Sequence, residues 1–557
     1  MMGVSALGKL CLFASAFLSS IYSASAVALP RDQSSETVND WESITPSTDL
    51  HWIPCFQNYT CTRLQVPLDY GDPGRGTTAI AFIKLAAKKV TKNTRNVLIN
   101  PGGPGGSGVD ILLANAIPFA DLIQAEHNVV GFDPRGVSHS GPEIDCWPGH
   151  PENRAQFEKL FYSETSYASS TSLSNQFAAA DFFGKACTST VGGKNGSAAY
   201  ISASAVARDL LSFVKAEQRA AGKPEKDAKL SYYGISYGTL LGTTFAHLFP
   251  DHVGPMILDG VLDTEDIYGL GWKTNLYDAD KAIESFYNFC HKGGPKNCAF
   301  WGPNVNNIRT RMHKLLENLK YNPIPVSNSP SCSLPLLATY SGVKEMAWQA
   351  VFQPLGAFPI LAAALAGLEK GDATAYVAAA TGGLLPANPC NNGTQGSTQD
   401  IGVVIKCVDG YPNNPLSTID EYKDYVKSQN AQSKFFGEVW PNNANGVLCR
   451  SFEVEPPKSG RLHGSILEER KTATPILFVS AEIDPVTPKR GAYKMSSVFR
   501  DSRVLIQDSV GHTALSAASS CLVQRAQEYY SHGHLPAKGT VCKPDAVPFQ
   551  SVGSASA

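Results

Sequence analysis

A serine flanked by glycines is the first feature of the sequence that could do chemistry. Gly234-Ile-Ser236-Tyr-Gly238 follows the predicted strand 229–233 and precedes the amphipathic stretch 240–248. A serine in a tight turn between a strand and a helix holds its hydroxyl above the edge of a sheet, and flanking glycines remove Cβ atoms that would collide there. An ordinary glycine-rich turn can carry the same letters. The position between a predicted strand and a predicted helix favours Ser236 as a nucleophile.

A serine hydroxyl is a weak nucleophile, so it needs a base and an acid that orients the base. Asp484 comes just after the apolar run 476–479, and His512 comes just after the run 504–507 in a Gly-His loop. Both then lie at carboxyl ends of predicted strands, where enzymes built on parallel sheets keep their reactive groups. Each alone could be a surface aspartate or a packed histidine. Their order along the chain favours a triad of Ser236, Asp484 and His512.

Other acids and histidines have weaker positions. Asp508 precedes His512 by only four residues and cannot supply a separate acid loop, while Glu482 lies closer to its strand than Asp484 does. Packing or solvation explains four further histidines, which lie near the predicted nucleophile helix or in a polar C-terminal segment: His247, His252, His532 and His534. The spacing of cysteines and histidines matches no zinc motif, so we expect no metal ion and no cofactor.

A glycine-rich loop upstream of the serine could supply hydrogen-bond donors. Residues 100–108 read Asn-Pro-Gly-Gly-Pro-Gly-Gly-Ser-Gly and follow the apolar run 97–99. Such a loop can cradle phosphate, but no Gly-Lys-Ser/Thr follows and no dinucleotide-binding spacing is completed. In an acyl-transfer enzyme the loop would instead offer a backbone N–H to the developing oxyanion, beside the N–H of Tyr237.

The elements that must position these residues form two patterns. Short β-branched runs alternate with helical windows, as in a mostly parallel sheet with crossover helices. The predicted strands are 79–84, 96–99, 128–132, 229–233, 256–258, 476–479 and 504–507. The stretch 265–471 lacks this rhythm and predicts helices at 282–289, 308–319, 343–351, 358–368 and 418–428. We therefore expect an α/β core in two parts, 27–264 and 472–557, with a helical insertion over 265–471.

The N-terminus predicts export. Lys9 precedes a short apolar stretch, and Ala24-Ser-Ala26 matches a signal-peptidase site, so we expect residues 1–26 to be removed. The stretch is too short and too rich in serine for a membrane anchor. We expect a secreted, extracellular protein.

Cysteines and glycosylation motifs agree with export. Removal of the signal leaves twelve of the 13 cysteines, an even number that allows six disulfides in an oxidising compartment. Short loops favour pairing Cys55 with Cys61 and Cys290 with Cys298. The triplets that could accept a glycan begin at Asn58, Asn195 and Asn392.

The composition limits the kinds of partner that we expect the protein to bind. The 47 Lys and Arg nearly balance the 49 Asp and Glu, the formal net charge is -2, and no basic run occurs. Such a chain has no field that would gather nucleic acid or an anionic membrane. We expect neither as a partner, and the sequence predicts no oligomeric state.

Taken together, the motifs resemble those of α/β-hydrolases in the group of proline iminopeptidases and secreted tripeptidyl aminopeptidases, with its TAP-like C-terminal region. The resemblance runs from about residue 90 to 525. The matching segments are Pro-Gly-Gly-Pro-Gly at 101–105, Gly131-Phe-Asp-Pro-Arg-Gly136, Tyr233-Gly-Ile-Ser-Tyr-Gly238, Leu258-Asp-Gly-Val261, Ile405-Lys-Cys-Val-Asp409 and the loops of Asp484 and His512. One departure is Pro101, where many iminopeptidases have histidine. No step of the chemistry needs that side chain, because the oxyanion donor is backbone.

The resemblance implies an α/β-hydrolase fold and roles for several residues. Gly103 would supply one oxyanion N–H, Ser236 the nucleophile, His512 the base and Asp484 its orienter. The helical insertion would be a lid over the active site, and Asp133 and Arg135 would brace the oxyanion loop.

The leading hypothesis is a secreted serine hydrolase that releases short N-terminal pieces, aminoacyl to tripeptidyl, through an acyl-enzyme. The same machinery also fits an esterase, lactonase or amidase with a small acyl substrate, because fold and triad do not choose the acyl group. A third reading, from another class, is a non-catalytic extracellular binding protein on a hydrolase scaffold.

An exopeptidase that acts from the N-terminus must recognise an ammonium group. Burying that cation needs a carboxylate, because an unpaired buried charge is strongly unfavourable. The insertion offers Glu265 and Asp266 at its entry and Glu438 beside Trp440 near its exit. Surface exposure is the competing explanation for each of the three.

Overall fold

A ten-stranded mixed sheet forms the centre of the computed structural model, which describes residues 37–114, 120–327, 335–384 and 398–550. The strand order is β1-β2-β3-β5-β4-β6-β7-β10-β11-β12. β1 to β3 are antiparallel to their neighbours, and the pairs from β5 through β12 are parallel. The strands are β1 (Ile53–Cys55), β2 (Tyr59–Pro67), β3 (Thr77–Leu85), β4 (Asn96–Asn100), β5 (Asn128–Phe132), β6 (Leu230–Ile235), β7 (Val253–Asp259), β10 (Leu477–Ile483), β11 (Arg503–Val510) and β12 (Val541–Cys542).

Both faces of the sheet are covered. Because side chains alternate along a strand, Val97 and Ile99 of β4 enter one apolar cluster and Leu98 enters the other. One cluster includes α1 (Gly108–Leu113) and α17 (Ser520–His532). The other includes α5 (Ala203–Ala220), α6 (Tyr237–Leu248) and α16 (Arg490–Val498). Burial on both faces explains why the parallel strands are continuous apolar runs in the sequence.

All seven predicted strands are confirmed. Three further strands of this sheet, β1, β2 and β12, were not predicted. β2 was missed because it buries Leu64 and Val66 while Arg63 and Gln65 stay partly exposed. That alternation is weaker in a sequence than a fully apolar run.

Helices fill most of the chain between β7 and β10. They are α7 (Thr264–Tyr268), α8 (Ala279–Asn297), α9 (Val305–Tyr321), α10 (Tyr340–Ala350), α11 (Pro354–Leu368), α12 (Thr374–Ala379), α13 (Thr398–Gly410), α14 (Ile419–Gln432) and α15 (Trp440–Ala444), with a small hairpin of β8 (Ile324–Val326) and β9 (Leu336–Ala338). The five predicted helices are confirmed as parts of α8, α9, α10, α11 and α14. The capping box of Thr418 and Glu421 is present at the start of α14.

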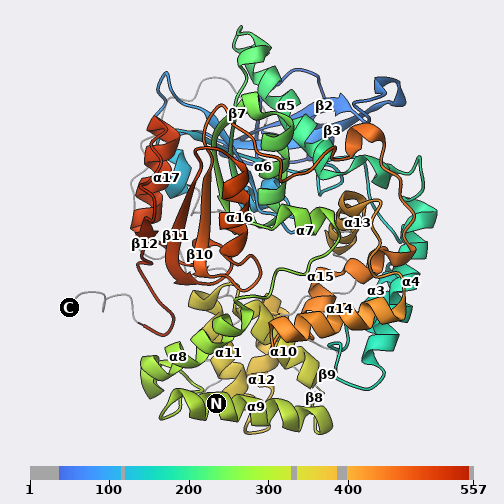
Figure 1. The fold of residues 1–557 in the computed structure, drawn as a ribbon, viewed down its shortest axis with the longest axis vertical. Coiled ribbons are helices and arrows are strands. Elements are labelled where there is room, and N and C mark those ends of the chain that lie inside the picture. The colour runs from blue at the N-terminus through green and yellow to red at the C-terminus, as the bar shows by residue number, and fades with distance from the viewer. Residues whose placement is uncertain (1–36, 115–119, 328–334, 385–397, 551–557) are drawn as a thin grey trace, which may run out of the picture.

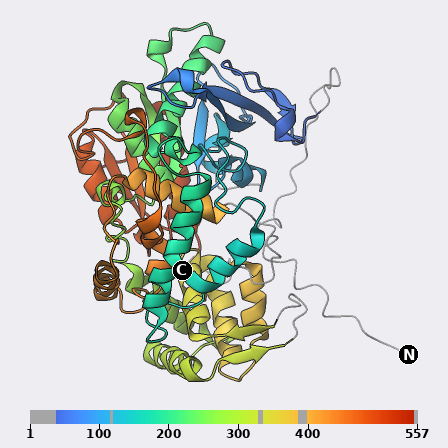
Figure 2. The ribbon, with the colours of Figure 1, turned by 90° about the vertical axis from the view of Figure 1, so that its right-hand side faces the viewer.

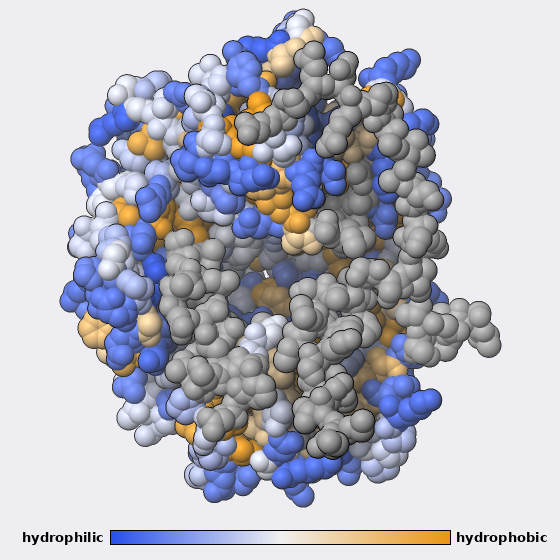
Figure 3. Space-filling view, turned by 180° about the vertical axis from the view of Figure 1, so that it is seen from behind, coloured by the Kyte–Doolittle hydropathy of each residue, from blue (hydrophilic) through white to orange (hydrophobic). Residues whose placement is uncertain are grey.

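The helical region lies at the carboxyl ends of the strands. Ile483 and Val510, at the ends of β10 and β11, line a cavity together with Phe289 of α8 and Leu355 of α11. In Figures 1 and 2, α9 to α12 occupy the end of the molecule opposite the β1 to β3 strands. From behind, the surface is hollowed near the middle of the molecule, with hydrophobic residues in small groups among hydrophilic ones (Figure 3).

Two helices from before β6 join this region. They are α3 (Pro151–Phe161) and α4 (Ser172–Thr190), which lie beside α13 to α15 in Figure 1. Gly184 of α4 packs so tightly on the chain after α15 that a Cβ there would lie 2.5 Å from the carbonyl carbon of Ser451. The region over the strand ends is therefore built from two separate stretches of sequence.

Disulfides tie several of these elements together. The structure describes the bonds Cys55–Cys61, Cys146–Cys187, Cys290–Cys298, Cys407–Cys449 and Cys521–Cys542. The two predicted pairs are thereby confirmed. Cys332 and Cys390 lie outside the described residues, as do Asn392 and the expected signal segment 1–26.

Several expectations concern the surface. Asn58 and Asn195 are exposed, as an acceptor of a glycan must be. Within the described ranges, no helix has both the length and the apolar character needed to cross a membrane. The same ranges hold no group of three or more His, Cys, Asp or Glu side chains arranged to hold a metal ion.

Candidate active site

Ser236 lies in a strained turn between β6 and α6. Its φ of 54° and ψ of -120° belong to a conformation that L-residues rarely adopt. The flanking glycines are required: a Cβ on Gly234 would lie 2.5 Å from the carbonyl oxygen of Gly238, and one on Gly238 would lie 2.7 Å from that of Asn100. The predicted strand-turn-helix context is confirmed.

The glycine-rich loop packs directly on this turn. Gly102 has a φ of 88°, and a Cβ there would lie 2.4 Å from the Ile235 carbonyl oxygen and 2.7 Å from the Tyr237 nitrogen. Its own N–H donates to the Asn100 side chain at 3.0 Å. Within the described chain, the backbone N–H groups of Gly103 and Tyr237 have no hydrogen-bond partner. Two donors are thus available beside the serine.

Asp133 holds the far end of this loop. Its carboxylate accepts from the Ser107 hydroxyl at 2.6 Å and from the Val109 N–H at 3.1 Å, and it also accepts from the His139 N–H. Burial raises the pKa of Asp133 to about 6, although these donors lower it. The brace expected from Asp133 is therefore present.

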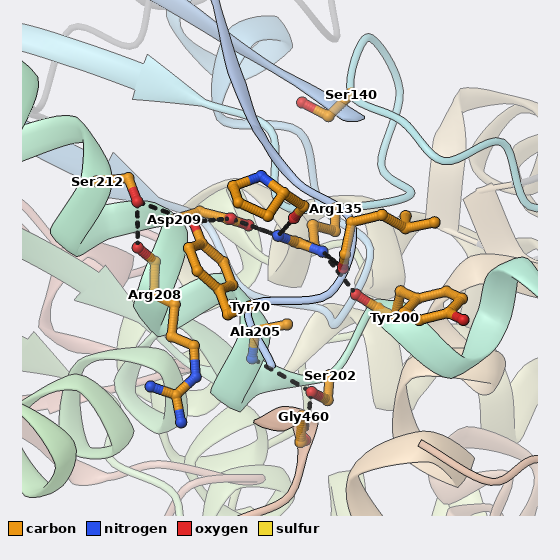
Figure 4. A network of polar contacts seen from close by, with 12 residues as sticks. Tyr70, Arg135, Ser140, Tyr200, Ser202, Ala205, Arg208, Asp209, Ser212 and Gly460 are labelled. Atoms are coloured by element: carbon orange, nitrogen blue, oxygen red, sulfur yellow. Dashed lines mark hydrogen bonds and ion pairs between the residues drawn. The ribbon is translucent and has the colours of Figure 1, made fainter. Parts of the chain in front are cut away.

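Arg135 does not brace the loop, contrary to expectation. Its guanidinium forms a buried two-point ion pair with Asp209 of α5, at 2.6 and 2.7 Å (Figure 4). Its other bonds go to the carbonyl oxygens of Pro67, Leu68 and Tyr200. Arg135 therefore ties the end of β2 to α5, because its long side chain extends away from the loop that Asp133 contacts.

Asp484 and His512 meet as predicted for neighbouring strand ends. Asp484 follows β10, His512 follows β11, and Nδ1 of the imidazole lies 3.2 Å from both carboxylate oxygens. Asp484 is fully buried and also accepts from the N–H groups of Val486, Thr487 and Thr513 and from the Thr487 hydroxyl. Burial acts to raise its pKa, but His512 and the backbone donors outweigh burial and hold the pKa below its ordinary value. The carboxylate therefore stays ionised beside the imidazole.

The end of β7 connects this pair to the serine. The N–H of Ser236 donates to the Asp259 carbonyl at 2.9 Å, and a Cβ on the next residue, Gly260, would lie 3.4 Å from Cε1 of His512. The described structure records no hydrogen bond between the Ser236 hydroxyl and the His512 ring. Such bonds are often long before substrate binds.

Asp259 is a second buried acid at this site that the sequence analysis did not select. Its side chain accepts from the Ala514 N–H in the His512 loop at 2.9 Å and from the Tyr233 hydroxyl at 3.0 Å. Burial raises its pKa to about 6. It holds the histidine loop against the sheet, and its position in Leu258-Asp-Gly at a strand end was the signal that could have identified it.

The helical region contacts the histidine directly. The carbonyl oxygen of Phe352, just after α10, accepts a hydrogen bond from the backbone N–H of His512 at 2.9 Å. The two rings meet edge-on with centroids 5.2 Å apart. Nothing in the sequence near Phe352 distinguishes it from other buried aromatic residues.

The three acids proposed to anchor an ammonium group all have partners. Glu265 is exposed and pairs with Lys494 at 2.8 Å, and Asp266 accepts from backbone and hydroxyl groups of residues 273 and 274. Glu438 is buried, but Lys344 neutralises it at 2.9 Å, and the hydroxyls of Tyr340 and Thr165 donate to it. The structure does not bring these three acids together.

Glu345 of α10 is buried, and no cationic side chain of the described residues contacts it. Among the described residues its polar contacts are two long ones from the Asn443 amide, at 3.3 and 3.4 Å. Burial raises its pKa to about 8. α10 leads directly to Phe352 and thus to His512. The signal in the sequence was a glutamate on the buried face of a predicted helix.

Comparison with known protein families identifies the fold. The model of the alpha/beta hydrolase fold matches residues 95–328, and that of the TAP-like protein family matches residues 433–542. The chain has the α/β-hydrolase fold. The expected fold and the expected TAP-like C-terminal region are thereby confirmed, and this α/β-hydrolase is an enzyme of the serine hydrolase class.

Similar proteins cover most of this α/β-hydrolase. It is 27% identical over 515 residues to serine protease Hip1 of Mycobacterium tuberculosis (strain ATCC 25618 / H37Rv), covering 88% of this chain and 91% of that protein. It is 25% identical over 519 residues to tripeptidyl aminopeptidase of Streptomyces lividans, covering 91% and 87%. It is also 27% identical over 499 residues to carboxylesterase B of Mycobacterium tuberculosis (strain CDC 1551 / Oshkosh), covering 87% and 86%.

Proposed function

We propose that this protein is a secreted serine peptidase that removes short N-terminal pieces, aminoacyl to tripeptidyl, from peptides. The observation that carries the proposal is the ionised Asp484 on Nδ1 of His512, connected through the end of β7 to a strained serine that has two free N–H groups next to it. Similarity to a serine protease and a tripeptidyl aminopeptidase supports peptides as the substrate class.

The chemistry follows from these positions. With Nδ1 on Asp484, Nε2 of His512 takes the proton of the Ser236 hydroxyl as its oxygen attacks the scissile carbonyl. The N–H groups of Gly103 and Tyr237 stabilise the negative oxygen of the tetrahedral intermediate. His512 then gives the proton to the leaving amine, the C–N bond breaks, and the acyl group stays on Ser236. Water, deprotonated by His512, releases the N-terminal piece and restores the serine.

Glu345 is the acid that we propose for recognition of the substrate ammonium group, in preference to Glu265, Asp266 and Glu438. A buried carboxyl group without a cation is unfavourable unless a ligand supplies the charge. Glu265 and Glu438 already have a lysine, and Asp266 has three donors.

The test compares tripeptidyl chromogenic substrates with a free or an acetylated N-terminus. We expect cleavage of the free peptide and its loss on acetylation, with Ser236→Ala reducing turnover by several orders of magnitude. Parent-level turnover by Ser236→Ala would contradict the assignment of Ser236 as the nucleophile.

The similarity to carboxylesterase B gives the second candidate function, an esterase. Equal cleavage of both peptides, together with faster cleavage of short acyl esters, would support that function instead.

A further inference from the structure

Asp409 lies in the motif Ile405-Lys-Cys-Val-Asp409 of α13, to which the proposed mechanism assigns no role. It is 6% exposed, and no basic side chain contacts it in the part of the chain that the structure describes. One carboxylate oxygen accepts the Ala203 N–H at 2.7 Å, and the other accepts a short hydrogen bond from the Tyr237 hydroxyl. A buried acid with two hydrogen-bond donors and no cationic partner fixes the positions of those donors.

Tyr237 is the residue whose backbone N–H faces the reacting carbonyl in the proposed mechanism. It is the first residue of α6, so its N–H has no acceptor within the helix. Its ring extends from the same Cα and is 4% exposed, with its hydroxyl fixed on Asp409. The Tyr237 side chain therefore ties the backbone next to Ser236 to Asp409.

α13 also contacts the other oxyanion element. A Cβ on Gly402 would lie 2.7 Å from the carbonyl oxygen of Pro104, the residue after Gly103. Cys407, between Gly402 and Asp409, is bonded to Cys449. One disulfide-anchored helix of the helical region therefore reaches both sides of the proposed oxyanion hole.

We infer that Asp409 is a positioning residue of the oxyanion hole, which sets the Tyr237 N–H through the tyrosine hydroxyl. This inference rests on the proposed acyl-transfer function. It does not depend on whether the acyl group comes from a peptide or an ester. Asp409 would act through an N–H that stabilises the oxyanion, so its effect should appear in the transition state and not in ground-state binding.

The test uses Tyr237→Phe and Asp409→Asn in the full chain. Removing an oxyanion donor lowers kcat by about 10²–10³-fold, so a misplaced one should lower it by about 10–100-fold with KM within twofold. The affinity for a boronate inhibitor, which forms a tetrahedral adduct on Ser236, should fall by the same factor as kcat/KM. The double variant should lose no more than the worse single variant, because both changes break one contact.

Lys406→Met is the matched control on the same helix. Lys406 is buried on the Trp272 ring and donates to the carbonyl oxygens of Asn443 and Ala444, away from both oxyanion elements. This variant should lower the melting temperature and leave the ratio of boronate to substrate affinity unchanged.

Two outcomes would contradict the inference, and they differ from failure of the proposed function. Tyr237→Phe with parental kcat and boronate affinity would overturn it, as would losses that add in the double variant. The first could be seen even if Asp409→Asn folds poorly, because Tyr237→Phe keeps the ring. A parent that a fluorophosphonate does not label at Ser236 would overturn the proposed function and this inference together.

Discussion

At the residue scale, Glu345 lowers the stability that the rest of the fold provides. Its pKa of about 8 exceeds that of an ordinary glutamate, because burial favours the neutral form. Between about pH 4.5 and 8 the unfolded chain releases this proton while the folded chain keeps it, so the free energy of unfolding falls as pH rises through that window. Such a group is retained when function needs it.

Glu345→Gln should therefore stabilise the protein while weakening recognition. We expect a higher melting temperature than the parent at pH 8 and no difference near pH 4.5. We also expect KM for free-amino peptides to rise about tenfold or more, with ester turnover unchanged. Melting curves at the two pH values and paired peptide and ester kinetics measure both effects.

Glu438→Gln is the control, for which we expect the opposite change in melting temperature at pH 8. Burial acts to raise the pKa of Glu438, but Lys344 outweighs it and holds that pKa below its ordinary value. Glu438 contributes stability above the unfolded pKa, and this is lost as pH falls through the folded one. Its substitution should lower the melting temperature at pH 8. A fall for Glu345→Gln at pH 8 would refute the assignment of Glu345.

Sequence patterns predict the nucleophile, base and acid because each follows a strand in a local motif. Asp409 and Phe352 could not be assigned in the same way. Their roles depend on hydrogen bonds to Tyr237 and His512, more than a hundred residues away in sequence. A buried acid is recognisable as such only after the helices around it are packed.

At the element scale, α13 is the helix whose position matters most for the proposed oxyanion hole. The Cys407–Cys449 bond closes 42 residues of chain, and the Cys290–Cys298 bond, which joins α8 to the residue after it, closes eight. Chain entropy alone predicts stabilisation of about 4 kcal/mol for the first bond and about 2.5 kcal/mol for the second.

Removing the two disulfides in separate alanine double variants should give different kinds of loss. Without Cys407–Cys449, kcat should fall at least fivefold at a temperature where the protein is still folded, because α13 can shift under Tyr237 and Pro104. Without Cys290–Cys298, only the melting temperature should fall. Circular dichroism and kcat, measured well below both melting temperatures, separate the two effects. Similar kcat values in both variants would argue against α13 as a positioning element.

Elements differ in how well the sequence predicts them. Strands β4 to β7, β10 and β11 and helices α8 to α11 and α14 were predictable, because fully apolar runs and long amphipathic windows are strong signals. The short helices α12 and α15 and the hairpin of β8 and β9 were not, because a few residues hold too little periodicity. The resemblance to known hydrolases implied a lid, but it did not show that α3 and α4 join the helical region.

At the scale of the whole molecule, the site draws on three distant parts of the chain. The first part of the core supplies the glycine loop and Ser236, the helical region supplies Phe352 and Asp409, and the last strands supply Asp484 and His512. This arrangement requires a correctly packed helical region for activity. Disulfides within and beside that region are consistent with a protein that must keep it in place outside the cell.

Export should therefore be visible as both processing and oxidation. Expressed with its natural N-terminus in a secreting host, the protein should appear in the medium and begin at Val27, because Ala24-Ser-Ala26 is the expected cleavage site.

Of the twelve cysteines that remain after cleavage, the described disulfides account for ten. Thiol labelling under denaturing, non-reducing conditions should thus find two free thiols at most, and N-glycosidase should lower the mass if Asn58, Asn195 or Asn392 carries a glycan. Retention in the cell with the N-terminus intact, or eight or more free thiols, would contradict secretion.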